Sequence, residues 1–110
     1  MTSFLINNDT YYSPPSINFL YDDKDLTTYT GHLFIYNAKD SSHLNLTLPT
    51  TSYFIGTSLI FKNSKLYYNI QTTSNNIKQI DGTISNFICG SNNFSNLVFD
   101  GSNWLVAITN

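Results

Sequence analysis

The sequence predicts an all-β fold, namely a small antiparallel β-sandwich or barrel, jelly-roll-like, with an extended N-terminal arm. Of its 110 residues, 15 are Asn, 13 are Ser and 13 are Thr, and these short polar side chains compete with the helical backbone for hydrogen bonds. Short runs of β-forming residues recur between turn signals, as in sandwiches and barrels. No window shows a helical period. The length suits one domain.

Residues 1–30 differ from the rest, and we expect an arm there and a β-domain over 31–110. Pro14 and Pro15 fix an extended local backbone, and an acidic cluster follows at residues 22–25. Only two short apolar patches, residues 4–6 and 17–20, interrupt the polar sequence. An extended arm of this kind suits docking along the surface of a neighbouring protein.

The β-domain is predicted from its apolar runs, taken in order. Leu44, Leu46 and Leu48 alternate with polar residues, which is the period of a half-buried strand, and Pro49 ends it. The other runs are bounded by Gly, Asn, Asp and Ser. We expect strands over residues 33–36, 44–48, 59–61, 66–70, 77–80, 83–88, 94–99 and 104–108.

Two hairpins are predicted by Asp-Gly pairs that lie between apolar runs. Gly, and to a lesser degree Asp, tolerates the positive φ that tight hairpin turns require. We therefore expect Asp81 with Gly82, and Asp100 with Gly101, to shape turns. Trp104 opens the last strand, and we expect its ring to pack in the core or in a subunit interface.

The charge of the chain argues against several classes of partner. The net charge is −2 and the five basic residues are all Lys, so no basic patch predicts nucleic-acid binding. No apolar stretch is long enough for a membrane span, and the N-terminus lacks the features of a signal peptide. Weak self-repulsion together with apolar strand faces predicts a homo-oligomer.

Candidate catalytic and metal-binding residues are few. His32 and His43 have no ligand at metal-site spacing, and Cys89 has no adjacent base, so we expect a small buried core residue there. Asp22, Asp23 and Asp25 lack the spacing of an EF-hand loop. We expect no cofactor, no metal and no catalytic residue, and hence a protein that is not an enzyme.

Tyrosines supply the alternative hypothesis, a carbohydrate-binding or receptor-binding module. Tyr53, Tyr67 and Tyr68 could stack against a host glycan beside the many amide side chains. The competing interpretation is that aromatic residues favour strands and pack in cores or interfaces. Coplanar, exposed rings would distinguish the two.

Four motifs in order resemble a β-structured module of phage and large DNA virus fibre, spike and virion decoration proteins. They are residues 44–49 (LNLTLP), 56–63 (GTSLIFKN), 80–82 (IDG) and 97–108, which contain the closing Asp-Gly-x-Asn-Trp hairpin. Residues 66–69 depart from the module, which has small residues there, and residues 1–30 match none of it.

The resemblance implies a non-enzymatic virion structural protein, such as a capsid decoration protein, a minor capsid protein or a component of a head or tail fibre. It implies a homotrimer, and we expect the N-terminal arm to anchor it to a capsid or tail protein. The expected location is the virion, assembled in the host cytoplasm. The resemblance implies no catalytic residue.

Overall fold

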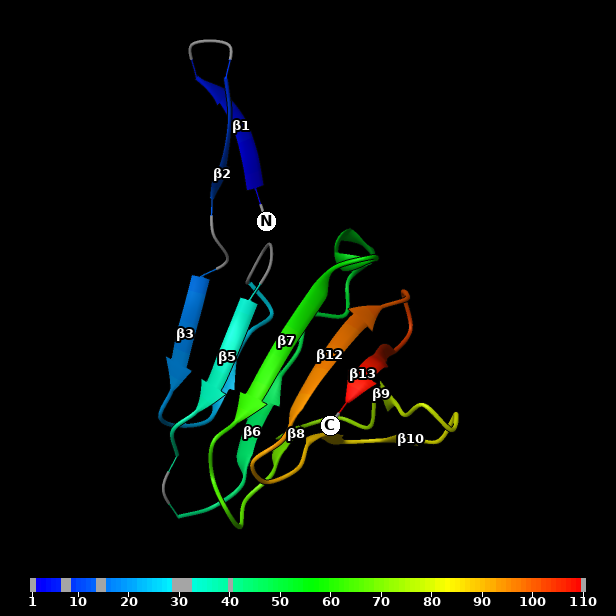
Figure 1. The fold of residues 1–110 in the computed structure, drawn as a ribbon. Helices are drawn as coiled ribbons and strands as arrows, with labels where there is room; N and C mark the ends of the chain where they lie inside the picture. Colours follow the sequence, from blue (N-terminus) through cyan, green and yellow to red (C-terminus); the bar gives the residue numbers. More distant parts are fainter. Residues whose placement is uncertain (1, 7–8, 14–15, 29–32, 40, 110) are drawn as a thin grey trace.

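The computed structural model describes residues 2–6, 9–13, 16–28, 33–39 and 41–109, and it is all-β, as predicted (Figure 1). One 3-10 helix, η1 (Ser52–Phe54), interrupts the strands. Within the described residues, no helix is long and apolar enough to cross a membrane. The strands are β1 (Thr2–Ile6), β2 (Asp9–Ser13), β3 (Ser16–Leu20), β4 (Lys24–Asp25), β5 (Leu33–Asn37), β6 (Leu44–Thr47), β7 (Ser58–Asn63), β8 (Ile70–Thr72), β9 (Ile77–Lys78), β10 (Ile84–Ser85), β11 (Phe87–Cys89), β12 (Phe94–Phe99) and β13 (Trp104–Thr109).

Two packed sheets form the body. The larger has seven strands in the order β10-β9-β13-β12-β7-β5-β3, and the smaller has four in the order β11-β8-β6-β4. Buried side chains from both sheets fill the space between them, including Ile35, Leu44 and Phe61. Trp104 and Cys89 are also fully buried in this core, and the expectation that Cys89 is a small core residue is confirmed.

The direction of the strands differs from the antiparallel, jelly-roll-like arrangement that the sequence predicts. From β3 to β8 the chain alternates between the two sheets, and β3, β5 and β7 run parallel, as do β4, β6 and β8. The chain therefore winds through three coils, as in a solenoid. In the body, antiparallel pairs join β12 to β7 and β13, β10 to β9, and β11 to β8. Side-chain alternation reports which face is buried and carries no information on strand direction.

A repeat of 26 residues accounts for the parallel stacking of the second and third coils. Leu33 pairs with Leu59, and Leu44 pairs with Ile70. Asn37 and Asn63 occupy equivalent positions, both fully buried, and the Asn37 side-chain amide donates a hydrogen bond of 3.2 Å to Asn63 Oδ1. Such ladders of like residues are typical of stacked coils.

Two segments of the predicted arm belong to the sheets. β3 pairs with β5 and β4 pairs with β6, while Leu20 and Leu26 are buried in the core. The apolar run at residues 17–20 is long enough for a strand that buries one face, which explains this difference from an arm ending at residue 30. The β1–β2 hairpin extends away from the body (Figure 1).

Candidate functional site

The outer face of the seven-stranded sheet is unusually apolar. Strand alternation places every second side chain there, away from the core. Ile17, Phe19 and Ile108 on this surface are 56%, 58% and 55% exposed. We call the surface the apolar face, and its apolar members are Ile17, Phe19, Phe34, Tyr36, Ile60, Phe94, Val98, Leu105 and Ile108.

The strand register lines these residues up in rows that cross the sheet. One row runs through Ile17, Phe34, Ile60, Asn96 and Ile108. The row beside it runs through Phe19, Tyr36, Lys62 and Phe94, and the Phe19 and Tyr36 rings stack at 5.4 Å. Lys62 is the one charged side chain in these two rows, and its ammonium donates to the Asn92 carbonyl at 3.2 Å. The face is therefore nearly uncharged.

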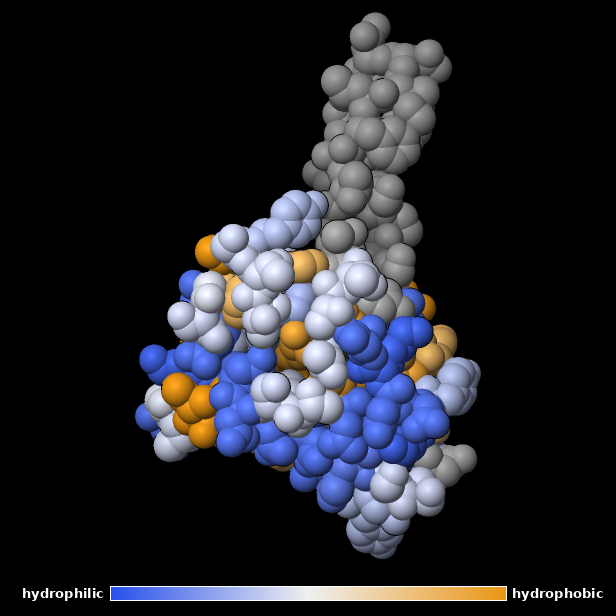
Figure 2. All heavy atoms as spheres, turned by 180° about the vertical axis from the view of Figure 1, so that it is seen from behind, coloured by the Kyte–Doolittle hydropathy of each residue, from blue (hydrophilic) through white to orange (hydrophobic). Residues whose placement is uncertain are grey.

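The outer face of the four-stranded sheet is polar instead. Asn45 and Gln71 are joined by a side-chain hydrogen bond of 2.8 Å, and the hydroxyls of Thr47 and Thr73 lie 3.1 Å apart. This sheet lies behind the larger one in Figure 1, and Figure 2, which views the molecule from behind, shows hydrophilic residues over much of that side. Of the two sheets as described, it is thus the seven-stranded one that presents a broad apolar surface.

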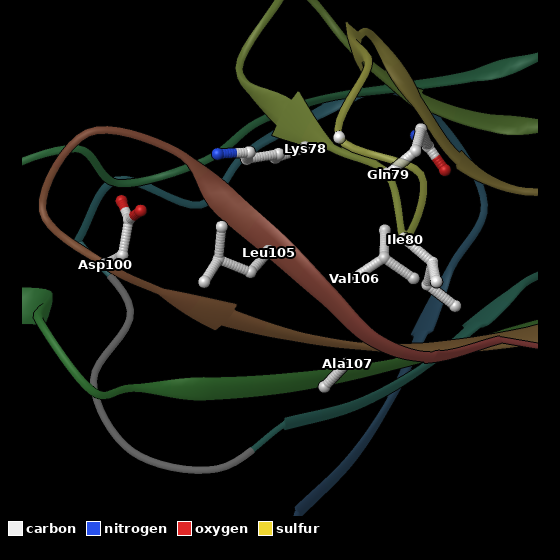
Figure 3. A pocket seen from close by; sticks show the side chains of 8 residues that line it. Lys78, Gln79, Ile80, Asp100, Leu105, Val106 and Ala107 are labelled. Atoms are coloured by element: carbon white, nitrogen blue, oxygen red, sulfur yellow. The ribbon is translucent and has the colours of Figure 1, made fainter.

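An open hollow of about 380 Å³ adjoins the apolar face at Leu105. Ile80 and Ala107 add apolar atoms to its lining, while Lys78 and Asp100 bring opposite charges (Figure 3). Hydrogen bonds from the Asn103 and Ser102 backbone amides lower the pKa of Asp100, and Lys78 adds to this shift. The hollow extends the apolar face toward the β9–β10 end of the sheet.

The structure places the predicted turn residues at the tips of two hairpins. Gly82 and Gly101 have φ of +90° and +104°. Asp81 Oδ1 accepts hydrogen bonds from the backbone and hydroxyl of Thr83, and Asp100 Oδ1 accepts from the Ser102 and Asn103 amides. Hydrogen bonds from Thr83 lower the pKa of Asp81. These side chains shape turns and point to no ligand.

Trp104 packs entirely inside the protein. Its ring is fully buried and lies 5.1 Å from the Phe99 ring. Its indole Nε1–H donates a hydrogen bond of 2.9 Å to the Pro49 carbonyl, 55 residues away in the chain. The residue thus joins the closing hairpin to the loop that follows β6.

The three tyrosines of the carbohydrate hypothesis do not form one platform. Tyr53 lies in η1, before β7 begins, whereas Tyr67 and Tyr68 follow the end of β7. A six-residue strand is about 17 Å long, so the two groups lie at opposite ends of it. Tyr53 and Tyr67 are highly exposed, while Tyr68 is half-buried with its ring edge-on to His43.

The other candidate residues are accounted for by local contacts. His43 Nδ1 accepts a hydrogen bond from the Asn69 amide at 2.8 Å, and His32 lies outside the described residues. The Lys39 ammonium, 2.7 Å from Asp23, and the Asn45 amide hold the pKa of the Asp23 carboxyl below its usual value. In the described part of the chain, no three His, Cys, Asp or Glu side chains gather as a metal site would require.

Comparison with known proteins supplies no relative: no family model, no curated protein and no solved structure matches the chain. The apolar face is therefore the structural feature from which we infer function.

The sequence predicted apolar strand faces but did not show where the apolar face lies, although a signal for its position was present. The segments Leu33-Phe34-Ile35-Tyr36-Asn37-Ala38-Lys39 and Leu59-Ile60-Phe61-Lys62-Asn63-Ser64-Lys65 repeat the same pattern. This repeat predicts stacked, equivalent strands. Its inward positions carry Ile35 and Phe61, so the apolar residues Phe34 and Ile60 must point outward.

Proposed function

We propose that the protein is a non-enzymatic structural component of a virus particle, and that it assembles with copies of itself through the apolar face. The observation that carries the proposal is the exposure of Ile17, Phe19 and Ile108 on one nearly uncharged sheet surface. The virion setting comes from the resemblance of residues 44–108 to modules of fibre, spike and decoration proteins.

The size of the apolar face supports an interaction surface. Five long strands, spaced about 4.8 Å apart and about 17 Å long, make a flat footprint of roughly 400 Å². Most of this footprint is apolar, and apolar patches of a few hundred Å² on a folded chain often mark an interaction site. Burial of the exposed Ile and Phe side chains in an assembly removes apolar surface from water, which is the main driving force for association.

A homotrimer is the assembly that this proposal favours. Three flat faces can turn toward a common three-fold axis and enclose one apolar core, with each face covering part of its neighbours. The contact in such a closed ring is heterologous, so one part of the apolar face meets a different part of the neighbouring copy's face. The β1–β2 hairpin, which extends from the body in Figure 1, is then available to contact a capsid or tail protein.

Sedimentation of the purified protein tests the proposal. At micromolar concentration, the wild type should sediment at about three times the 12.5 kDa chain mass or at a multiple of that trimer mass. Ile108→Lys places a charge on the apolar face and should weaken assembly at least tenfold. Leu66→Lys is the matched control, because Leu66 is 64% exposed but lies in the loop after β7, away from the face.

Assembly of Leu66→Lys should equal that of the wild type. A wild type that stays monomeric at micromolar concentration, or two variants with the same effect, would contradict the proposal.

A further inference from the structure

The edge of the seven-stranded sheet at β3 has the backbone geometry of an unpaired strand. Among the residues that the structure describes, β3 is the last strand of the sheet, beside β5 (Figure 1). The Ala38 amide donates to the Leu20 carbonyl at 2.7 Å, so Leu20 directs its carbonyl toward the β5 side. Backbone groups alternate in direction along a strand, and the amides and carbonyls of Ile17 and Phe19 therefore point away from β5.

Asn18, the middle residue of β3, carries an unsatisfied polar group. Its side-chain Nδ2 is buried and has no hydrogen-bond partner in the described part of the protein. Asn18 pairs with Ile35 of β5, whose side chain offers no acceptor, whereas the buried Asn37 amide elsewhere in the sheet is satisfied by Asn63 on the adjacent strand. Buried polar groups without a partner are rare in folded proteins, so each such group calls for an explanation.

β3 also lacks the features that usually protect an edge strand. Its five residues, Ser-Ile-Asn-Phe-Leu, contain no charge and no proline. Natural edge strands commonly carry Lys, Pro or a bulge that blocks pairing with another chain. Ile17 and Phe19 are instead both more than half exposed.

We propose that β3 pairs in antiparallel fashion with β3 of a second copy, about a two-fold axis that passes beside Asn18. This register places Ile17 opposite Phe19 of the partner subunit, where the outward amides and carbonyls exchange hydrogen bonds. Asn18 then faces Asn18 of the partner subunit as a non-hydrogen-bonded pair, with Cα atoms about 4.5 Å apart. Each Nδ2 gains a side-chain oxygen as its acceptor.

This contact rests on the proposed function, in which copies of the protein assemble with one another. It uses a different surface from the apolar face. The apolar face contributes side chains, whereas the β3 edge contributes backbone groups. The two contacts are compatible, since trimers joined in pairs by two-fold β3 contacts form a hexamer of dihedral symmetry. The β3 contact alone gives a dimer.

Disulfide trapping tests the register. In a Cys89→Ala background, Asn18→Cys places each thiol opposite itself across the axis, within the Cα separation that disulfides require. Ile17→Cys is the matched control on the same strand. In the proposed register, Ile17 faces Phe19 of the partner subunit, so two cysteines at position 17 do not face each other. On mild oxidation, Asn18→Cys should form a linked dimer at least tenfold faster than Ile17→Cys.

Amide hydrogen exchange of the wild type provides a second readout that needs no variant. The Ile17 and Phe19 amides should become protected as the protein concentration rises, whereas assembly through the apolar face alone leaves them fast. Fast exchange at all concentrations, or equal cross-linking of the two cysteine variants, would overturn the proposal.

The Ile108→Lys change separates this proposal from the proposed function. Asn18→Cys should still cross-link when Ile108→Lys has abolished the trimer, because the substitution leaves β3 untouched. Loss of the cross-link there would show that β3 makes no contact of its own. Cross-linking of Asn18→Cys, together with a wild type that never forms a trimer, would refute the apolar-face assembly and support the edge contact.

Discussion

Replacement of Trp104 tests how the closing hairpin holds the body together. The ring is fully buried against Phe99, and its indole N–H is bonded to the Pro49 carbonyl. Trp104→Ala removes both contacts. Trp104→Phe keeps most of the ring and removes the hydrogen bond, so the pair of variants separates packing from hydrogen bonding.

The expected magnitudes follow from these contacts. A buried Trp→Ala change costs about 3–5 kcal/mol through lost packing and the cavity it leaves. The unsatisfied Pro49 carbonyl adds about 1 kcal/mol or more. Domains of this length have a free energy of unfolding of roughly 5–15 kcal/mol, so Trp104→Ala should leave the protein at the margin of stability. Trp104→Phe should cost about 2–3 kcal/mol.

Urea unfolding followed by far-UV circular dichroism measures these changes, since the only Trp fluorophore is lost in both variants. With a urea dependence near 1.5 kcal/mol per M, Trp104→Phe should lower the midpoint by about 1.3–2 M. The exposed control Leu66→Ala should change the free energy of unfolding by about 0.5 kcal/mol at most. A Trp104→Ala variant within 1 kcal/mol of the wild type would refute a buried, hydrogen-bonded ring.

Three further predictions follow from the coils and the core. Asn63→Ala deprives the buried Asn37 amide of its acceptor and should lower the free energy of unfolding by about 2–4 kcal/mol; a urea midpoint equal to that of the wild type would exclude the ladder. The pKa of Asp23 is lowered in the folded state, chiefly by Lys39. The ionised Asp23 carboxyl therefore adds to the free energy of unfolding above about pH 4, and this stabilisation is lost as the pH falls through the folded pKa. The acid-induced decline in the unfolding midpoint between pH 5 and pH 2 should therefore be shallower in Asp23→Asn, and identical profiles would contradict this ion pair. Burial raises the pKa of the Cys89 thiol, so alkylation at neutral pH should be at least tenfold slower in the native protein than in urea, and equal rates would place the thiol at the surface.

The class of fold and both Asp-Gly turns could be anticipated because the physics behind them is local. Positive φ at Gly82 and Gly101 and the Asx-type hydrogen bonds of the preceding Asp residues depend on a few neighbouring residues. Burial of alternate residues in β6 likewise follows from the Leu44-Leu46 alternation. These features need no knowledge of the other sheet.

Strand direction and the apolar face depend on contacts between distant residues, and local patterns do not determine them. Asn37 and Asn63 stack because two coils are equivalent, which becomes evident only when the sequence is compared with itself at a spacing of 26 residues. Ile17 and Phe19 resemble any short apolar run until the register places them beside β5. For the same reason, the sequence alone does not show that Tyr53 lies at one end of β7 while Tyr67 and Tyr68 lie at the other.

Oxidative footprinting across a range of protein concentrations tests the assembly surface most directly. Tyr36, beside Phe19 of β3, and Phe94, on β12, lie on the apolar face, whereas Tyr53 in η1 and Tyr67 in the loop after β7 are 77% and 79% exposed. If the apolar face is the assembly surface, oxidation of Tyr36 and Phe94 should fall severalfold between nanomolar and micromolar protein, while Tyr53 and Tyr67 stay unchanged. Constant oxidation of Tyr36 and Phe94, or protection of Tyr53 and Tyr67 instead, would contradict the account.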